Sequence, residues 1–518
     1  MTKRKFFAVL ATVALAANMT VWLTACSSVD TPVIEPTGEE MARMDAPDFD
    51  EGNIVLTFAA LSDSHIMVDP ETSMQDLLNK IEQMGYPLDQ LSPDTRKLVS
   101  TVFRNKEYFQ AALPFLASQS SKGLDALVMP GDLTNNGFQQ EIDTLLKYYK
   151  NEPAINGKPF IYCSGNHDIF SEDEGAFTQK MKKAFDNTGA YDADDPDRGW
   201  GANDSRHSVV GGIHFIQVNV NNYEWSNGVY SDDVKQWLDD ELRVATTENP
   251  GKPVFVLSHL AIQNTVTGSD FYAPTTPDMV WACDYIKPIL DKYPQAVLLS
   301  GHTHFSMNTE RSILQDRFTM INMGVIHYMI TDYGYWNMNE GNSYIPEDFD
   351  RHPQGSLFEV DNNGTTRIHN YDFGLGKQMG QPLVLPAPGY RNSLTRYGWD
   401  RANKPGPILP SHDIVAQVED GKATVTVPRA SGNGSQVLYY LVNITDEVGN
   451  IVADNHKYIN DLLITAQEED MANPVTLGLG TLPAGHTYTI KVTACNVWGT
   501  QGDSLTTTVR IPEDTANE

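Results

Sequence analysis

Five stretches of the chain share one pattern, in which a run of apolar and β-branched residues ends abruptly in a polar cluster. These stretches are NIVLTFAALSDSH (53–65), LDALVMPGDLTNNG (124–137), KPFIYCSGNHD (158–168), KPVFVLSHL (252–260) and QAVLLSGHTH (295–304). Each apolar run has the length of a buried strand. The pattern therefore predicts five buried strands, each followed by a polar loop.

Helix-like stretches lie between these runs and predict helices at residues 95–119, 231–245 and 279–293. Pro114 should kink or break the first helix, because proline removes a backbone donor. Asp232 lies in the first turn of the second helix, where negative charge suits the helix dipole. Strands that alternate with helices predict a layered α/β domain.

Later stretches add strands to this domain. Residues 207–222 predict a hairpin or two adjacent strands. Residues 318–330 and 355–373 predict further strands, the last with an Asn-Asn-Gly turn. We expect these strands to complete a second sheet that faces the first.

The amino-acid composition of the chain changes after residue 375. Residues 376–405 are rich in Gly and Pro and predict a linker. Short alternating runs follow and predict an all-β sandwich at residues 406–515. Within it, LPAGHTYTIKVTACNVWG (482–499) resembles the fibronectin type III pattern, with Tyr488 where that family has its tyrosine-corner residue. Such a domain could bind a glycan or a protein.

The N-terminus predicts a targeting segment. The basic stretch MTKRKFF precedes the apolar run AVLATVALAA (8–17), which is too short to span a membrane. The small residues before Cys26 resemble the lipobox of bacterial lipoproteins, which implies removal of residues 1–25 and acylation of Cys26. The alternative is an ordinary secretory signal with a chance cysteine.

Residues 26–52 then predict a flexible tether, because its first half is rich in Ser, Thr, Pro and Glu and lacks apolar periodicity. Ser27, rather than aspartate, follows Cys26, as in lipoproteins sorted to the outer membrane of Gram-negative bacteria. We therefore expect a lipid-anchored protein of the bacterial cell envelope, on the outer membrane rather than the inner one.

Length, composition and charge limit the kinds of function that the sequence predicts. The 518 residues allow about two to four domains, and the hydrophobic content of 41% is ordinary for a globular chain. A formal net charge of -30 argues against nucleic-acid binding, which needs a basic face. Beyond Cys26 only three cysteines remain, Cys163, Cys283 and Cys495, which predict buried hydrophobic positions rather than a disulfide framework.

The polar clusters contain the candidate functional residues, since functional sites lie at the carboxyl ends of strands in open α/β sheets. In chain order the clusters are Asp63-Ser64-His65, Gly131-Asp132, Gly165-Asn166-His167-Asp168, His259 and Gly301-His302-Thr303-His304. Imidazole and carboxylate together suit transition metals such as Mn, Fe and Zn. Two such ions can hold both the attacking and the leaving oxygen of a displacement at phosphorus.

This set, in this order, resembles the motif of the calcineurin-like metallophosphoesterase superfamily over residues 53–375. The resemblance implies a four-layer α/β/β/α sandwich and two divalent transition metal ions (Mn, Fe or Zn). It also implies hydrolysis of a phosphate ester, either a diester or a monoester, by a hydroxide that the two metals share.

The roles that this resemblance implies can be carried over residue by residue. Asp63, His65 and His304 would hold the first metal, Asn166, His259 and His302 the second, and Asp132 would bridge them. His167 would act near the leaving oxygen as a general acid or donate to the phosphate. Asp168 would orient His167 from behind. Arg206, beside a predicted strand, is a candidate phosphate contact or else a solvated loop arginine.

Single members of the set have ordinary explanations. His259 alone would be a core or loop histidine, and Asp132 and Asn166 alone would be turn residues; only their joint occurrence favours a metal site. The remaining histidines, which include His327, have no such support.

Differences from the motif indicate which branch of the superfamily the chain resembles. The stretches GDLTNNG and GNHD lack the arginine and glutamate typical of serine/threonine protein phosphatases. Asn135 stands where purple acid phosphatases have a metal-binding tyrosine. What remains resembles the bacterial branch with cyclic-nucleotide phosphodiesterases and secreted phosphoesterases. The alternative is a non-catalytic envelope binding protein with a relic phosphoesterase domain, although no expected ligand has been replaced.

Overall fold

A computed structural model describes most of the chain. Two compact units are distinguished, Met1–Glu40 and Met41–Glu518, and the second contains both sheets, the sandwich and the candidate site described below. The described residues are 38–67, 79, 104–169, 176–185, 191, 199–219, 222–224, 227–270, 283–331, 335–337, 341–343 and 351–513. Cys26 and the predicted signal peptide lie outside them. Among the described residues, no helix combines the length and apolarity needed to cross a membrane.

The first sheet contains the first three predicted strands. Its order is β16-β15-β14-β1-β2-β3, and β17 also pairs with β15. Strands β1, β2 and β3 run parallel, whereas β14 runs antiparallel to β1. The bounds are β1 Ile54–Ala60, β2 Ala126–Pro130, β3 Phe160–Cys163, β14 Gln354–Asp361, β15 Thr366–Asp372, β16 Lys377–Gln378 and β17 Leu383–Leu385.

The second sheet contains the other two predicted strands. Its order is β10-β11-β9-β8-β5-β4, with β5, β8, β9 and β11 parallel. The bounds are β4 Arg206–Val210, β5 Ile213–Gln217, β8 Val254–Leu257, β9 Ala296–Ser300, β10 Ile313–Gln315 and β11 Thr319–Asn322. A separate hairpin pairs β6 (Asn222–Glu224) with β7 (Asn227–Val229).

The two sheets pack face to face through apolar side chains. Phe58 of β1 meets Phe215 and Phe255 of the second sheet edge to face, with ring centroids 5.4 and 5.2 Å apart. Phe358 of β14 stacks on Phe58 at 4.7 Å. Because all four rings are fully buried, each contributes several kcal/mol to the core, about 3–5 by the cost of truncation to alanine.

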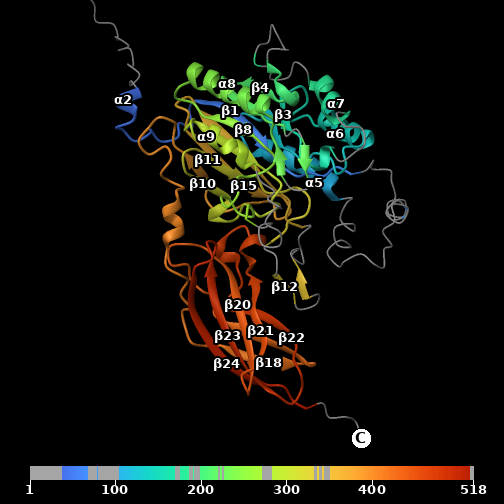
Figure 1. Ribbon diagram of the computed structural model, residues 1–518, viewed down its shortest axis with the longest axis vertical. Helices are drawn as coiled ribbons and strands as arrows, with labels where there is room; N and C mark the ends of the chain where they lie inside the picture. The colour runs from blue at the N-terminus through green and yellow to red at the C-terminus, as the bar shows by residue number, and fades with distance from the viewer. Residues whose placement is uncertain are drawn as a thin grey trace, which may run out of the picture. The chain divides into compact units, whose positions relative to one another are not determined.

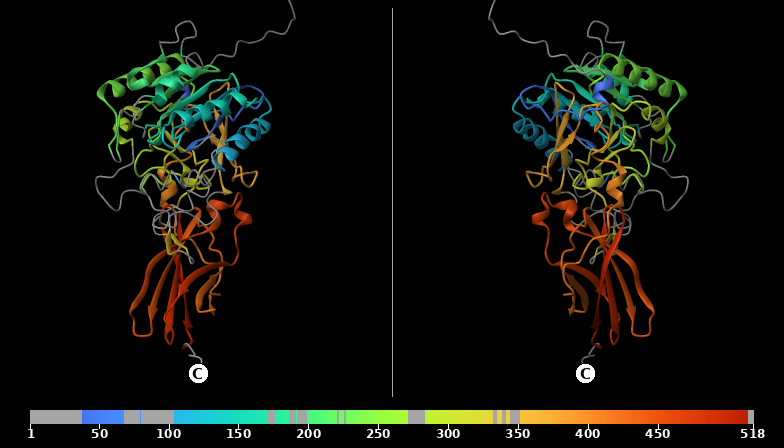
Figure 2. Two further views of the ribbon diagram at one scale, coloured as in Figure 1. Left: turned by 90° about the vertical axis from the view of Figure 1, so that its right-hand side faces the viewer. Right: turned by 90° about the vertical axis from the view of Figure 1, so that its left-hand side faces the viewer.

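Helices cover the outer faces and complete an α/β/β/α arrangement (Figure 1). Figure 2 shows α8 and α5 on opposite sides of the two sheets. Ser231 caps α8, its hydroxyl accepting from the amide of Val234 at 3.3 Å. The bounds are α2 Gly38–Met41, α5 Arg104–Gln119, α6 Gln139–Asn151, α7 Ala176–Phe185, α8 Asp232–Glu248 and α9 Lys287–Leu290.

The break predicted as one outcome at Pro114 and the helix predicted at 279–293 need correction. Helix α5 continues through Pro114 to Gln119, so the proline does not end it; burial of Phe109, Leu113 and Leu116 against the first sheet holds the helix despite the lost donor. The helix predicted at 279–293 is, over its described part, a 3-10 turn followed by the single turn α9.

The C-terminal region is an all-β sandwich. One sheet has the order β13-β12-β21-β20-β23-β24 and the other β18-β19-β22, and they enclose a separate apolar core. The hydroxyl of Tyr488 donates to the carbonyl of Pro483 at 2.9 Å. The bounds are β12 Tyr335–Asn337, β13 Gly341–Ser343, β18 Val415–Glu419, β19 Lys422–Val427, β20 Val437–Asp446, β21 Ile451–Ile459, β22 Val475–Thr481, β23 Thr487–Asn496 and β24 Gln501–Arg510.

Part of the segment predicted as a linker belongs to the first sheet. Strands β16 and β17 pair with β15 there, and Tyr397 lies in the core between the two sheets. The end of the predicted tether is also fixed, because the amide of Asp50 donates to the Asp361 carboxylate at 2.8 Å. The domain boundaries themselves stay predictions.

A shared apolar cluster joins the sandwich to the segment that follows β11. Val325 and Met329 from that segment pack with Leu438, Leu462 and Leu463 of the sandwich. Beside this interfacial cluster, the indole of Trp498 donates to Glu310 at 2.9 Å and the side-chain amide of Asn308 donates to the carbonyl of Leu462 at 2.8 Å. The two regions are therefore packed together rather than loosely tethered.

Candidate metal centre

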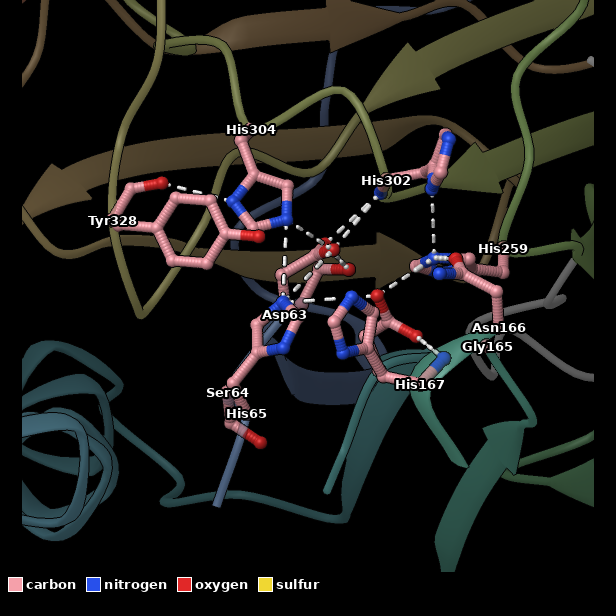
Figure 3. Close-up of polar contacts among 12 residues, drawn as sticks. Asp63, Ser64, His65, Gly165, Asn166, His167, His259, His302, His304 and Tyr328 are labelled. Atoms are coloured by element: carbon pink, nitrogen blue, oxygen red, sulfur yellow. Dashed lines mark hydrogen bonds and ion pairs between the residues drawn. The ribbon is translucent and has the colours of Figure 1, made fainter. Parts of the chain in front are cut away.

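The predicted ligands lie in loops at the carboxyl ends of the parallel strands (Figure 3). Asp63 and His65 follow β1, Asp132 follows β2 and Asn166 follows β3; His259 follows β8, and His302 and His304 follow β9. All seven side chains are buried. Backbone bonds fix neighbouring loops to one another; for example, the amide of His65 donates to the carbonyl of Asp132 at 3.0 Å. The structure thus brings together every predicted ligand.

Four of these residues form a first group, Asp63, His65, Asp132 and His304, whose donor atoms all lie within 4.8 Å of one another. The Nε2 atoms of His65 and His304 face each other at 3.2 Å. The Nε2 of His304 lies 3.1 Å from Asp63 Oδ1, and the Nε2 of His65 lies 3.7 Å from Asp132 Oδ2.

A second group combines Asp132, His259 and His302. The Nε2 of His259 lies 3.2 Å from three atoms, Asp132 Oδ2, Asn166 Oδ1 and His302 Nδ1. Asp132 therefore belongs to both groups, as a bridging ligand must.

These separations fit metal coordination. Ligand atoms about 2.0–2.2 Å from one cation lie roughly 3.0–3.5 Å from each other, and several donor pairs of each group are 3.1–3.2 Å apart. Without a cation, two buried imidazole nitrogens at this distance would need a proton between them. The donor set, five nitrogen or amide ligands with two carboxylates, suits two transition metal ions.

Backbone carbonyls orient two of the imidazoles. The Nδ1 of His259 lies 2.9 Å from the carbonyl of Pro130, and the Nδ1 of His304 lies 2.8 Å from the carbonyl of Tyr328. An Nδ1–H that donates to a carbonyl leaves the Nε2 lone pair for a metal. In both rings Nε2 is the atom that faces its group (Figure 3).

The ligand loops adopt strained backbone conformations. Five ligand residues have φ in the left-handed region: Asp63 (51°), His65 (44°), Asp132 (47°), His302 (66°) and His304 (56°). Each such conformation costs non-glycine residues on the order of 1 kcal/mol and persists only where the surroundings enforce it. Their concentration in one place marks a functional site.

Three glycines of the motif are needed because the loops approach so closely. A Cβ on Gly131 would lie 2.5 Å from the His259 ring, and one on Gly165 would lie 2.1 Å from Asp132 Oδ1. A Cβ on Gly301 would lie 2.3 Å from Asp63 Oδ2. The glycines therefore create the space in which the ligands converge.

The pKa values of the ligand side chains depend on one another. Burial would lower the pKa of His259, but the neighbouring Asp132 carboxylate raises it to about 9. Burial raises the pKa of Asp132, yet His259 and other histidines outweigh this and hold it well below its ordinary value. A cation that binds at Asp132 therefore displaces the proton of His259. Burial also keeps the pKa values of His65 and His302 low, which leaves these ligands neutral.

His167 lies beside the first group, with its ring 4.5 Å from that of His65. Its Nδ1 lies 2.7 Å from the carbonyl of Asn135, and its amide donates to Asp132 at 2.9 Å. The prediction that Asp168 orients this ring needs correction, because the Asn135 carbonyl occupies that position.

Asp168 instead ties two ligand loops together. Its carboxylate accepts from the amide and hydroxyl of Thr134 at 2.8 and 2.7 Å, from the amide of Gly165 at 2.9 Å and from that of Leu133 at 3.3 Å. It is thus a structural acceptor that fixes the loop of Asp132 against the loop of Asn166.

Arg206 does not share the exposure expected of a solvated loop arginine. Its side chain is only 2% exposed, and its guanidinium lies 4.9 Å from the ring centre of Trp200. It begins β4, at the edge of the second sheet. Its contact with substrate phosphate stays a prediction.

Sequence reasoning missed His327 and Tyr328, because residues 318–330 were predicted to be one strand. Strand β11 ends at Asn322, and the following segment turns toward the first group. The ring of Tyr328 lies 4.0 Å from that of His304, tilted by 32°, and the ring of His327 lies 6.0 Å from that of His65. Gly324, with a φ of 65°, was the available signal of a break.

Comparison with known proteins agrees with this geometry. The sequence model of the family described as calcineurin-like phosphoesterase matches residues 56–306. Among curated proteins, no sequence matches the chain.

Solved structures similar to parts of the chain include a purple acid phosphatase from yellow lupin, 10% identical, with a TM-score of 0.37. That match covers 64% of this chain and 53% of the other, so the chain spans about half of that protein. The twitchin kinase region from C. elegans is 19% identical over 22% of this chain and 18% of its own, with a TM-score of 0.15. The chicken interferon gamma receptor alpha chain is 12% identical over 30% of this chain and 66% of its own, with a TM-score of 0.14.

The family match spans both ligand groups, from Asp63 to His304. Residues 56–306 therefore form a calcineurin-like phosphoesterase domain.

Proposed function

We propose that the protein hydrolyses a phosphate ester at a two-metal centre, with Mn, Fe or Zn as the cations. Asp63, His65 and His304 hold one cation, Asn166, His259 and His302 hold the other, and Asp132 bridges them. The observation that carries this assignment is the membership of the Asp132 carboxylate in both ligand groups. Two cations at this site would polarise the phosphoryl group and lower the pKa of a water.

His167 is the proposed proton donor to the leaving oxygen. Its Nδ1 is placed to donate to the carbonyl of Asn135, so its Nε2 is an acceptor when the ring is neutral and a donor only when the ring is protonated. A protonated His167 can therefore deliver a proton from Nε2 to the departing alkoxide. Asp168 supports this step indirectly, by fixing the loop of Asn166 and His167 against the loop of Asp132.

The first test removes the metal. We expect the purified protein, loaded with Mn, to retain about two equivalents through dialysis and to hydrolyse bis-p-nitrophenyl phosphate or p-nitrophenyl phosphate. Chelation should abolish turnover, on the order of 10³-fold or more, and Mn should restore it. Faster turnover of the diester would make the protein a phosphodiesterase, and preference for the monoester would make it a phosphatase.

The alternative, a non-catalytic binding protein with a relic domain, leads to the opposite prediction. Such a protein would not retain two equivalents of transition metal through dialysis, and it would turn over neither substrate. The complete ligand set and its mutual distances favour the enzyme.

For the cellular context, we propose a lipid-anchored protein of the bacterial envelope, acylated at Cys26, with a fibronectin type III-like C-terminal domain. The basic and apolar N-terminal stretches and the small residues before Cys26 support the anchor. The two-sheet sandwich and the Tyr488–Pro483 hydrogen bond support the fibronectin-like assignment. Contact of this domain with a glycan or a protein belongs to the same proposal.

The anchor is tested by replacing Cys26 with serine in the full chain. The wild type should fractionate with membranes and take up a labelled fatty acid, and C26S should do neither. Equal labelling of both forms would contradict the proposed lipidation.

A further inference from the structure

His327 lies next to the first ligand group although it belongs to no ligand motif. Its amide donates to the carbonyl of Asp63 at 3.1 Å, and the amide of Ile326 donates to that of Ser62 at 3.0 Å. The segment that carries it therefore runs alongside the loop of Asp63. The His327 ring lies 6.0 Å from the ring of His65, which places it beside the metal centre.

The imidazole of His327 is buried and unsatisfied. The residue is 5% exposed, and neither ring nitrogen has a hydrogen-bond partner in the described part of the chain. By contrast, the Nδ1 atoms of His167, His259 and His304 each lie within 3 Å of a carbonyl. Leaving two buried polar atoms unpaired costs free energy, so this ring is placed for a partner that the described part of the chain does not supply.

The position of His327 is fixed by its neighbours. On one side the amide of Ile330 donates to the carbonyl of His304 at 3.0 Å, and on the other the amide of Gln354 donates to that of Val325 at 2.8 Å. Val325 and Met329 are anchored in the interfacial cluster with the sandwich. The backbone therefore cannot carry the ring away from the metal centre toward another partner.

We propose that His327 is a substrate-contacting residue, with a ring N–H that donates to a non-bridging oxygen of the phosphoryl group. The inference rests on the proposed function, since a phosphate ester bound at the cation site of Asp63, His65 and His304 would be the neighbour of this ring. A neutral imidazole offers one donor and one acceptor. The second nitrogen is then available to a water or hydroxyl on the substrate.

The experiment compares wild type, His327→Phe and His327→Gln in the full-length protein without its signal peptide, each loaded with Mn. Phenylalanine keeps the ring volume and removes both polar atoms, whereas glutamine keeps a donor and an acceptor. His369→Phe is the matched control, because His369 is half-buried on β15 and hydrogen bonds to Gln378. Inorganic phosphate is the probe, with its affinity measured by calorimetry and by the phosphate-dependent rise in Tm.

The expected result for H327F is full metal content, roughly tenfold or greater loss of phosphate affinity and about 10–100-fold loss of kcat/KM. H327Q should be intermediate, and H369F should match the wild type. H327F with unchanged phosphate affinity would overturn the inference, and so would loss of a metal equivalent, which would make His327 a ligand. If H327F fails to fold, H327Q decides by the same criteria.

Failure of the proposed function would look different. If the wild type holds two metals and binds phosphate but turns over neither ester, the proposed hydrolysis fails. The phosphate affinities of wild type and H327F still decide the contact of His327 in that case.

Discussion

Asp132→Asn is expected to lose hydrolysis and metal retention together, with kcat/KM reduced by about 10³-fold or more, or at least ~4 kcal/mol in the barrier. The Asp132 carboxylate is the ligand shared by both groups. Asparagine keeps its size but removes the charge that offsets two cations. Metal content by elemental analysis and turnover of bis-p-nitrophenyl phosphate measure the two losses.

Asp125→Asn is the matched control for this experiment. Asp125 precedes β2 as Asp132 follows it, and its carboxylate accepts the amide of Thr57 at 2.8 Å, far from either ligand group along the strand. We expect this variant to keep its metals and its activity. A D132N protein that retains two metals and full turnover would contradict the bridging role.

Gly165→Ala is expected to disturb the metal site although it replaces no ligand side chain. The new Cβ would stand 2.1 Å from Asp132 Oδ1 and 2.3 Å from its amide nitrogen, where ordinary contacts need 3.4 Å or more. The loops of Asp132 and Asn166 must therefore separate by about 1 Å, a displacement that typically costs on the order of 100-fold in turnover. Overpacking should also lower the free energy of unfolding by about 1–3 kcal/mol. Turnover and denaturant unfolding measure the two effects.

Gly251→Ala separates close approach from the general effect of adding a methyl group. The nearest atom to a Cβ there is Met41 Cε at 3.8 Å, an ordinary contact. This variant should behave as the wild type. If G165A keeps wild-type turnover, the two loops have more freedom than their hydrogen bonds to Asp168 suggest.

The ligand set could be predicted from the sequence because each ligand follows a buried strand. Within each sheet, parallel strands bring their carboxyl ends to one edge. The two facing sheets place these edges together, so Asp63 after β1 of the first sheet and His304 after β9 of the second converge. The glycines at 131, 165 and 301 gave further support, since close loop approach needs them. The two facing sheets and the all-β tail were predictable for a similar reason, because alternation and turn residues are local signals.

What the sequence could not reveal depends on contacts between loops. The orienting role of Asp168 was implied by the family resemblance, and only the folded loops bring Thr134 to its carboxylate. His327 was missed because the apolar run around it continues the pattern of β11.

The interfacial cluster constrains how this protein can change over evolutionary time. The carbonyl of Tyr328 orients His304, and the segment of Tyr328 rests on Leu438, Leu462 and Leu463 through Val325 and Met329. Exchange of the C-terminal region for an unrelated sandwich would leave Val325 and Met329 without their partners and would loosen a residue that aims a metal ligand. A chimera that joins the first region to an unrelated sandwich is therefore expected to hold His304 less firmly, even if each half folds.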